Sequence, residues 1–157
     1  MSPTVAVIVP VFNVGLYLTE CLDSFLSQTY ENFVIYAIND GSTDTSGMIL
    51  DCYKKKDSRI HVIHKKNEGV SSARNAGLDT VLREEQAEFI CFIDGDDKVS
   101  ETFLYDMVEA MVSSEVQMGF CLYQEFGKSG FIEFSNASEN NYPKSTLLQN
   151  QNDVEFH

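Results

Sequence analysis

The chain has 157 residues, 43% of them hydrophobic, which is enough for one buried core and too few for two domains of ordinary size. Its 24 acidic residues against 11 lysines and arginines give a formal net charge of -13, a charge that repels nucleic acid and an anionic membrane surface. No apolar run approaches the roughly 20 residues that span a bilayer. We therefore expect no nucleic-acid partner and no transmembrane segment.

The cysteines are widely spaced and form no C-x-x-C pair, which is typical of free thiols in a reducing compartment. They are Cys21, Cys52, Cys91 and Cys121. The N-terminus also lacks the basic region and long apolar stretch of a secretory signal. These features predict a cytoplasmic protein, at most peripheral at the inner face of a membrane.

Strand patterns recur along the chain with helical patterns between them. Val5–Val9 is a continuous apolar, β-branched run that ends at Pro10, which predicts a strand buried on both faces of a parallel sheet. Further strands of this sheet are predicted at Phe33–Ile38, Ile60–Ile63 and Phe89–Ile93, and edge strands at Met118–Tyr123 and Gly130–Phe134. We expect one α/β domain over residues 1–134, followed by a polar, loop-like tail over 135–157 that begins an acceptor region.

Helices are predicted from apolar residues at helical spacing. The stripe after Gly15 consists of Leu18, Cys21, Leu22, Phe25 and Leu26. The second helix has Ile49, Cys52 and Tyr53 on one side and ends at Lys54–Lys56, where cations suit the helix C-terminus. The third has a face of small residues, Ala73, Ala76 and Gly77. Ser100 is the predicted N-cap of a helix whose apolar side carries Leu104, Met107, Val108, Met111 and Val112.

A polar residue follows each of the predicted parallel strands, at equal spacing along the sequence. These residues are Asn13, Asp40, Asn67 and Asp94. Because parallel strands end at the same edge of a sheet, all of them lie at the edge where open α/β sheets bind ligands. The sequence therefore predicts a polar binding site there.

Three carboxylates crowd the end of the fourth strand, where Asp94, Asp96 and Asp97 surround Gly95. Like charges at this separation raise one another's pKa, and a divalent cation that prefers oxygen ligands relieves the repulsion. Gly95 leaves room for a ligand. The alternative is an acidic turn that caps the next helix.

The other groups at this edge suit a nucleoside diphosphate. Asn13 and Asp40 offer hydrogen bonds to a base or sugar, and Arg74 is one of the few cations available to a phosphate. Mn²⁺ or Mg²⁺ held by the aspartates would bridge to that phosphate. Each residue also has an ordinary structural interpretation, as a turn or cap residue or, for Arg74, as a solvated helix residue.

Several motifs occur in order over roughly residues 4 to 125: Pro10–Asn13, Leu22–Thr29, Asn39–Asp44, Asn67–Gly69, Ala73–Gly77 and Phe92–Asp97. Together they resemble the family 2 glycosyltransferases of the GT-A fold, a Rossmann-like α/β fold with helices on both faces of the sheet.

The resemblance implies roles for residues of these motifs. Those expected to bind the nucleotide sugar are Pro10, Val11, Phe12, Asn13, Asp40, Arg74, Asp94, Gly95 and Asp96. Among them, Asp40 is expected to hydrogen-bond the base, usually uracil, and Asp94 and Asp96 are expected to form the D-x-D motif that holds the metal.

This sequence departs from the family pattern at two places. Asn39 stands where the family often has a first aspartate, which puts the base preference in doubt. The family's general base lies well downstream of the D-x-D motif, and we expect it beyond the end of this chain, in a fold shortened at its C-terminal side. The late acid and base side chains lie in no recognisable motif: Glu139, Asp153, Glu155 and His157.

The predicted function is inverting transfer of a sugar from a nucleoside-diphosphate sugar, UDP in the first place, to a hydroxyl of a glycan or lipid-linked acceptor, in polysaccharide or glycan synthesis. A binding module without catalysis is the alternative. A haloacid-dehalogenase-like phosphatase also carries D-x-D after a strand, but that motif usually opens the domain, and Lys98 stands here where a small hydroxyl or valine is typical. Neither G-x-G-x-x-G nor a P-loop is present.

Overall fold

The computed structural model describes residues 2–84 and 87–114, then Met118, Gly119, Cys121 and the backbone of 124–127, 130–133 and 154–156. The chain divides into two compact units. The first comprises Met1–Leu22 and Glu31–Asp97, and the second comprises Asp23–Tyr30 and Lys98–His157. The predicted boundary between a domain over 1–134 and a tail over 135–157 lies outside the described residues and stays a prediction.

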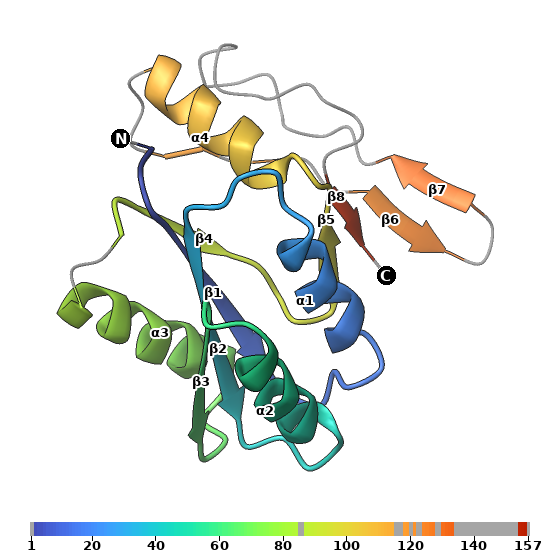
Figure 1. The fold of residues 1–157 in the computed structure, drawn as a ribbon. Helices are drawn as coiled ribbons and strands as arrows, with labels where there is room; N and C mark the ends of the chain where they lie inside the picture. Colours follow the sequence, from blue (N-terminus) through green and yellow to red (C-terminus); the bar gives the residue numbers. More distant parts are fainter. Residues whose placement is uncertain are drawn as a thin grey trace. The chain divides into compact units, whose positions relative to one another are not determined.

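The first unit is built on a parallel sheet, as predicted. Its strands are β1 (Val5–Val11), β2 (Phe33–Asp40), β3 (Ile60–Lys65) and β4 (Phe89–Phe92). They lie in the order β3-β2-β1-β4 (Figure 1). Every residue of β1 is buried, which explains why its sequence shows no alternation between apolar and polar residues. The four strands therefore end at one edge of the sheet.

Helices cover both faces of this sheet, which confirms the predicted fold class. After β1 the chain passes through α1 (Leu18–Leu26) to β2 and then through α2 (Ser46–Lys56) to β3. It then returns through α3 (Val70–Glu84) to β4, on the other side of β1. Right-handed crossovers in opposite directions put α2 and α3 on opposite faces, as Figure 1 shows.

The predicted apolar sides of α1 and α2 are only partly correct. In α1, the stripe residues Leu18, Cys21, Leu22 and Phe25 are buried as expected. In α2 the buried residues are Ser46, Leu50 and Tyr53, whereas Cys52 is exposed. Tyr53 belongs to both the predicted and the observed face, and the predicted face is rotated toward Cys52 by about a fifth of a turn, at 3.6 residues per turn. The cation-rich end at Lys54–Lys56 was predicted correctly.

The small-residue face of α3 allows this helix to approach the sheet closely. Ala73 and Gly77 are buried against a face of the sheet that contains Ala6, Ile8, Tyr36 and Ile38. A Cβ atom on Gly77 would lie 2.5 Å from Cγ2 of Ile8. Glycine is therefore required at this position by packing.

We expect Gly77→Ala to destabilise the fold, although alanine is the better helix former by about 1 kcal/mol. Relief of the clash requires α3 or Ile8 to move, and overpacking of this kind costs about 1–3 kcal/mol. Urea denaturation followed by circular dichroism measures the effect. Asn75→Ala, at an exposed position of the same helix, is the control and should leave the free energy of unfolding unchanged or slightly raised. Equal stability of Gly77→Ala and the wild type would contradict the packing argument.

In the second unit, α4 (Phe103–Ser113) begins later than predicted. Its N-cap residue is Thr102, so the prediction of Ser100 as N-cap is wrong. The first turn is held instead by Gln28, whose Oε1 accepts a hydrogen bond of 2.9 Å from the Leu104 N–H and whose Nε2 donates to the Ser100 carbonyl oxygen at 2.5 Å. Gln28, which is distant in the sequence, thus provides the acceptor for the first turn of α4 that Ser100 was expected to provide.

The remaining strands are short. They are β5 (Asp97–Val99), β6 (Gln124–Gly127), β7 (Gly130–Glu133) and β8 (Val154–Phe156). β7 agrees with the predicted strand at 130–134, whereas the described residues of the predicted strand 118–123 are not in a strand. β8 lies in the stretch predicted as loop and pairs in parallel with β6. Across the described ranges, no helix has both the length and the apolar character needed to cross a membrane.

Candidate nucleotide-binding site

A cavity of about 330 Å³ lies in the first unit where β1, β2 and β4 end and α3 begins. Its size falls at the lower end of the range for small-molecule sites, roughly 300–1,000 Å³. The lining residues are Pro10, Val11, Phe12, Val14, Asp40, Asn67, Gly69, Val70, Ala73, Asp94, Gly95 and Asp96. They come from four separate stretches of the chain that the parallel sheet brings together.

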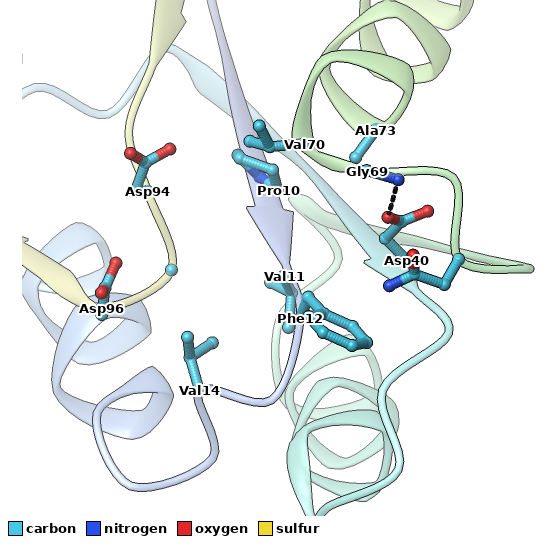
Figure 2. A pocket seen from close by; sticks show the side chains of 12 residues that line it. Pro10, Val11, Phe12, Val14, Asp40, Gly69, Val70, Ala73, Asp94 and Asp96 are labelled. Carbon is cyan, nitrogen blue, oxygen red and sulfur yellow. Dashed lines mark hydrogen bonds between the residues drawn. The ribbon is translucent and has the colours of Figure 1, made fainter.

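Most of the residues predicted to bind the nucleotide sugar line this cavity. Figure 2 shows Asp94 and Asp96 on one side, Asp40 on the other, and the end of β1 between them. Asn13 and Arg74 do not belong to the lining. Their predicted contacts with a nucleotide stay predictions.

Arg74 of α3 forms an ion pair with the D-x-D motif. Its Nη2 donates to Oδ1 of Asp94 at 2.6 Å, and the pair is partly exposed. One carboxylate of the acidic cluster is therefore already balanced by a cation. Arg74 is not a lining residue, so in this structure it contacts the site only through Asp94.

Asp97 has a raised pKa because it is partly buried beside two other carboxylates. Burial, together with the negative charges of Asp96 and Asp94, raises the pKa of Asp97 to about 7. The backbone N–H of Asp97 donates to the carbonyl oxygen of Asp94 at 3.1 Å and so closes the turn. This crowding of carboxylates agrees with the electrostatic argument made from the sequence.

The donor set of this turn suits a hard divalent cation. Within the part of the chain that the structure describes, no three His, Cys, Asp or Glu side chains are grouped to hold a metal ion. Asp94 and Asp96 nevertheless bring carboxylates to the same cavity. Mg²⁺ is commonly bound by one or two carboxylates with substrate phosphates completing the shell. The residues present fit a metal that binds together with a phosphorylated ligand.

Asp40 is held firmly at the opposite wall. Its carboxylate accepts hydrogen bonds from the N–H groups of Glu68 and Gly69, the latter at 2.8 Å, and from Lys65 Nζ at 2.7 Å. Burial alone would raise the pKa of Asp40, but these bonds outweigh it and hold the pKa below its usual range. Asp40 thus acts as an N-terminal cap supplied from β2 to the turn that begins α3.

Asn13 has a structural role, as the turn or cap interpretation of the sequence allowed, but its partners lie in a distant loop. Its φ of 55° is in the left-handed region, which asparagine tolerates better than most residues. Its Oδ1 accepts from the N–H groups of Thr43 and Asp44, at 2.8 and 3.3 Å. In return, Ser42 Oγ accepts from the Asn13 N–H at 3.1 Å. Asn13 therefore connects the loop after β1 to the loop after β2.

Three apolar lining residues were not among the predicted binding residues: Val14, Val70 and Ala73. Their positions next to or within the family motifs are the only signal in the sequence, since Val14 and Val70 each follow a motif and Ala73 begins one. Gly69, with φ of 91°, also lines the cavity and donates its N–H to Asp40. None of the four cysteines is in a disulfide, as predicted. Cys21 is buried beside the site, where its Sγ donates to the carbonyl oxygen of Asp94, and burial raises the pKa of its thiol.

Residues 6–157 match the family described as "Glycosyl transferase family 2". The chain belongs to the family 2 glycosyltransferases. This membership confirms the resemblance seen in the motifs and removes the phosphatase alternative.

Curated relatives in this glycosyltransferase family come from several bacteria. The chain is 40% identical to "Uncharacterized glycosyltransferase EpsJ" of Bacillus subtilis over 77% of its own length and 34% of that protein. It is 36% identical to "Glycosyltransferase GlyA" of Streptococcus pneumoniae over 89% of its length and 20% of that protein. It therefore spans only about a fifth to a third of these relatives.

Solved structures of glycosyltransferases share the fold. S. aureus TarS 1-349, in complex with UDP-GlcNAc, is 25% identical with a TM-score of 0.71, covering 83% of this chain and 37% of that one. The mannosyltransferase PcManGT from Pyrobaculum calidifontis, in complex with GDP-Man and Mn²⁺, is 21% identical with a TM-score of 0.65, covering 78% and 35% of the two chains. The GT-A fold of this glycosyltransferase chain is thus established.

Proposed function

We propose that this chain is the donor-binding part of an inverting glycosyltransferase that uses a nucleoside-diphosphate sugar. The observation that carries the proposal is the meeting of Asp40, Asp94 and Asp96 around one cavity at the carboxyl edge of the sheet. A donor of this class has a base at one end and a diphosphate at the other. The cavity offers Asp40 on one wall and the D-x-D pair on the opposite wall, which matches that polarity.

UDP is the proposed nucleotide. S. aureus TarS, whose structure was solved with UDP-GlcNAc, is similar to this chain in fold and at 25% identity. The base would lie near Asp40, with Gly69 and Val70 at the start of α3 beside it. Because the Asp40 carboxylate already accepts bonds from two N–H groups and Lys65, the base would share this carboxylate with them.

A divalent ion, Mn²⁺ or Mg²⁺, would be held by Asp94 and Asp96. When bound, it supplies positive charge that offsets the negative charge developing on the departing diphosphate. Arg74 balances Asp94 and so keeps the net charge of the acidic cluster from repelling the donor phosphates. Asp96 has no such partner in the described structure and is the carboxylate we assign most directly to the ion.

The proposed reaction is a single displacement with inversion. An acceptor hydroxyl, deprotonated by a general base, attacks the anomeric carbon as the bond from that carbon to the diphosphate oxygen breaks. The nucleoside diphosphate leaves with the bonding electron pair. The acceptor is a hydroxyl of a glycan or a lipid-linked sugar, in polysaccharide or glycan synthesis on the inner face of the membrane. The general base is not assigned to any described residue.

A thermal-shift panel of UDP, GDP, ADP and UDP-sugars, with and without Mn²⁺, tests the proposal. A ligand that binds only the folded state raises the melting temperature according to its affinity. We expect the largest shift with UDP or a UDP-sugar together with Mn²⁺. Release of UDP from a UDP-sugar, measured on the same samples, separates an enzyme from a binding module. The absence of a shift with every nucleotide would refute the proposal.

A further inference from the structure

A chain of hydrogen bonds crosses from α2 through β3 to the end of β2. Nε2 of His64 lies 3.1 Å from Oδ1 of Asp51. Nδ1 of the same ring lies 2.9 Å from Nδ2 of Asn39, and Oδ1 of Asn39 accepts from the Ser42 N–H at 3.0 Å. None of these residues lines the cavity. The last of these bonds reaches Ser42, in the loop after β2, and this loop lies next to the cavity.

The chemistry of the groups fixes the direction of each bond. An amide nitrogen can only donate, so Nδ2 of Asn39 donates to Nδ1 of His64, which must carry no proton. The ring proton is then on Nε2 and is donated to the Asp51 carboxylate. In this arrangement the ring has one accepting and one donating nitrogen. A doubly protonated ring has no acceptor to offer to Asn39.

The alternation of side chains along β2 explains why Asn39 and Asp40 have separate partners. Successive side chains of a strand point to opposite faces, so Asn39 faces α2 while Asp40 faces the start of α3. Asn39 is only 6% exposed and both ends of its amide are bonded. It is therefore not available to read the base.

The bonds from Asn39 reach the wall of the cavity in two steps. Asn39 fixes the N–H of Ser42, and Ser42 Oγ accepts from the N–H of Asn13. Asn13 directly follows Phe12 and precedes Val14, both of which line the cavity. These bonds therefore link the loop after β2 to the loop after β1, and His64 lies at the far end of this connection.

We propose that His64 is a positioning residue for the donor site, which it supports through Asn39 and Ser42 without contacting the ligand. Asn39 and His64 form a matched pair, because an aspartate at position 39 has no proton to give to Nδ1. The departure from the family pattern at Asn39 thus sets the position of a loop and does not change the base preference. The expected effect of His64 on the affinity for UDP rests on the nucleotide site proposed above.

The test compares His64→Gln with His64→Leu in the full chain. A glutamine side chain offers an acceptor to Asn39 and a donor to Asp51, whereas leucine offers neither. We expect His64→Gln to keep the affinity for UDP with Mn²⁺ within about twofold. His64→Leu should weaken it by about fivefold to tenfold, a factor equivalent to the net value of one hydrogen bond lost within the protein from the support of the loop. His61→Leu, in the same strand and outside the cavity, is the matched control and should bind as the wild type does.

Nitrogen-15 NMR of the histidine rings provides a readout that does not depend on nucleotide. The wild type should show His64 with an unprotonated Nδ1 and a protonated Nε2. Asn39→Asp should shift His64 toward the doubly protonated form. The opposite tautomer in the wild type, equal affinity of His64→Leu and wild type, or equal damage by glutamine and leucine would overturn the proposal. If the wild type binds no nucleotide, the proposed function fails and the positioning role fails with it, while the NMR result still decides the bonding arrangement.

Discussion

Replacing Asp96 by asparagine is expected to remove the gain in nucleotide affinity that Mn²⁺ provides. An amide oxygen is a weaker ligand than a carboxylate and carries no charge to neutralise the ion. Metal contacts of this kind are worth several kcal/mol, so the affinity for UDP in the presence of Mn²⁺ should fall by about 100-fold. Isothermal titration calorimetry with and without Mn²⁺ measures both affinities.

The fold should survive this change. Asp96 contributes to the repulsion that raises the pKa of Asp97, so its neutralisation leaves the metal-free protein at least as stable as the wild type. Asp79→Asn, an exposed position of α3 outside the cavity, makes the same charge change and should retain the Mn²⁺-dependent gain. If Asp96→Asn keeps that gain, Asp96 is not a metal ligand.

Asp40→Ala is expected to damage both stability and donor binding. The substitution leaves the N–H groups of Glu68 and Gly69 without their acceptor and removes the anion that faces Lys65. Loss of a buried hydrogen-bonded partner costs about 1–3 kcal/mol. Because the same bonds set the turn before α3 at the cavity wall, we also expect UDP binding to fall below detection. Chemical denaturation and calorimetry report the two effects separately.

The stability difference between wild type and Asp40→Ala should depend on pH. The pKa of Asp40 is lower in the folded than in the unfolded protein, so its stabilising contribution is present above the unfolded value of about 4. That contribution is lost as the pH falls through the lower, folded value. Denaturation curves at pH 7 and at successively more acidic pH should therefore converge for the two proteins.

Glu68→Gln is the control for the loss of negative charge beside Lys65, because Asp40 and Glu68 both pair with that lysine. Glu68 also contacts Lys65, at 2.8 Å, but its side chain is 63% exposed. Exposed pairs of this kind contribute little. We expect the variant to unfold and bind UDP as the wild type does. If Glu68→Gln lost as much stability and UDP affinity as Asp40→Ala, the effect of Asp40→Ala would come from the charge beside Lys65. The cap on α3 would then not explain it.

The sheet and the acidic side of the site were predictable because their signals are local. Short β-branched apolar runs such as Val5–Val9 favour a strand covered on both faces, and parallel strands end at the same edge of a sheet. Those two facts bring Asp40 and Asp94 to one edge without knowledge of any contact. The resemblance to the family then supplied the expected metal and nucleotide.

Features that depend on distant hydrogen bonds were not predictable. Asn13 bonds to Thr43 and Asp44, and α4 begins at a turn held by Gln28, and neither partner is visible in the local sequence. Serine often fills the N-cap position, so the local sequence predicts Ser100 there, although Gln28 supplies the acceptor. The buried face of α2 is likewise not encoded locally, since only the fold decides that Leu50 and not Cys52 is covered.

Asn39 and Asp40 are neighbours in β2 but bond to partners on opposite faces of the sheet, which limits the sequence changes that this strand can accept. Substitutions elsewhere in β2 alter packing by increments, but insertion or deletion of one residue in the strand would exchange the two side chains between faces. The amide would then meet the start of α3, and the carboxylate would meet Nδ1 of His64, which could donate to it only if the ring gained a second proton. We therefore expect the length of β2 to tolerate less variation than its composition, with length changes among homologues confined to the loops outside it.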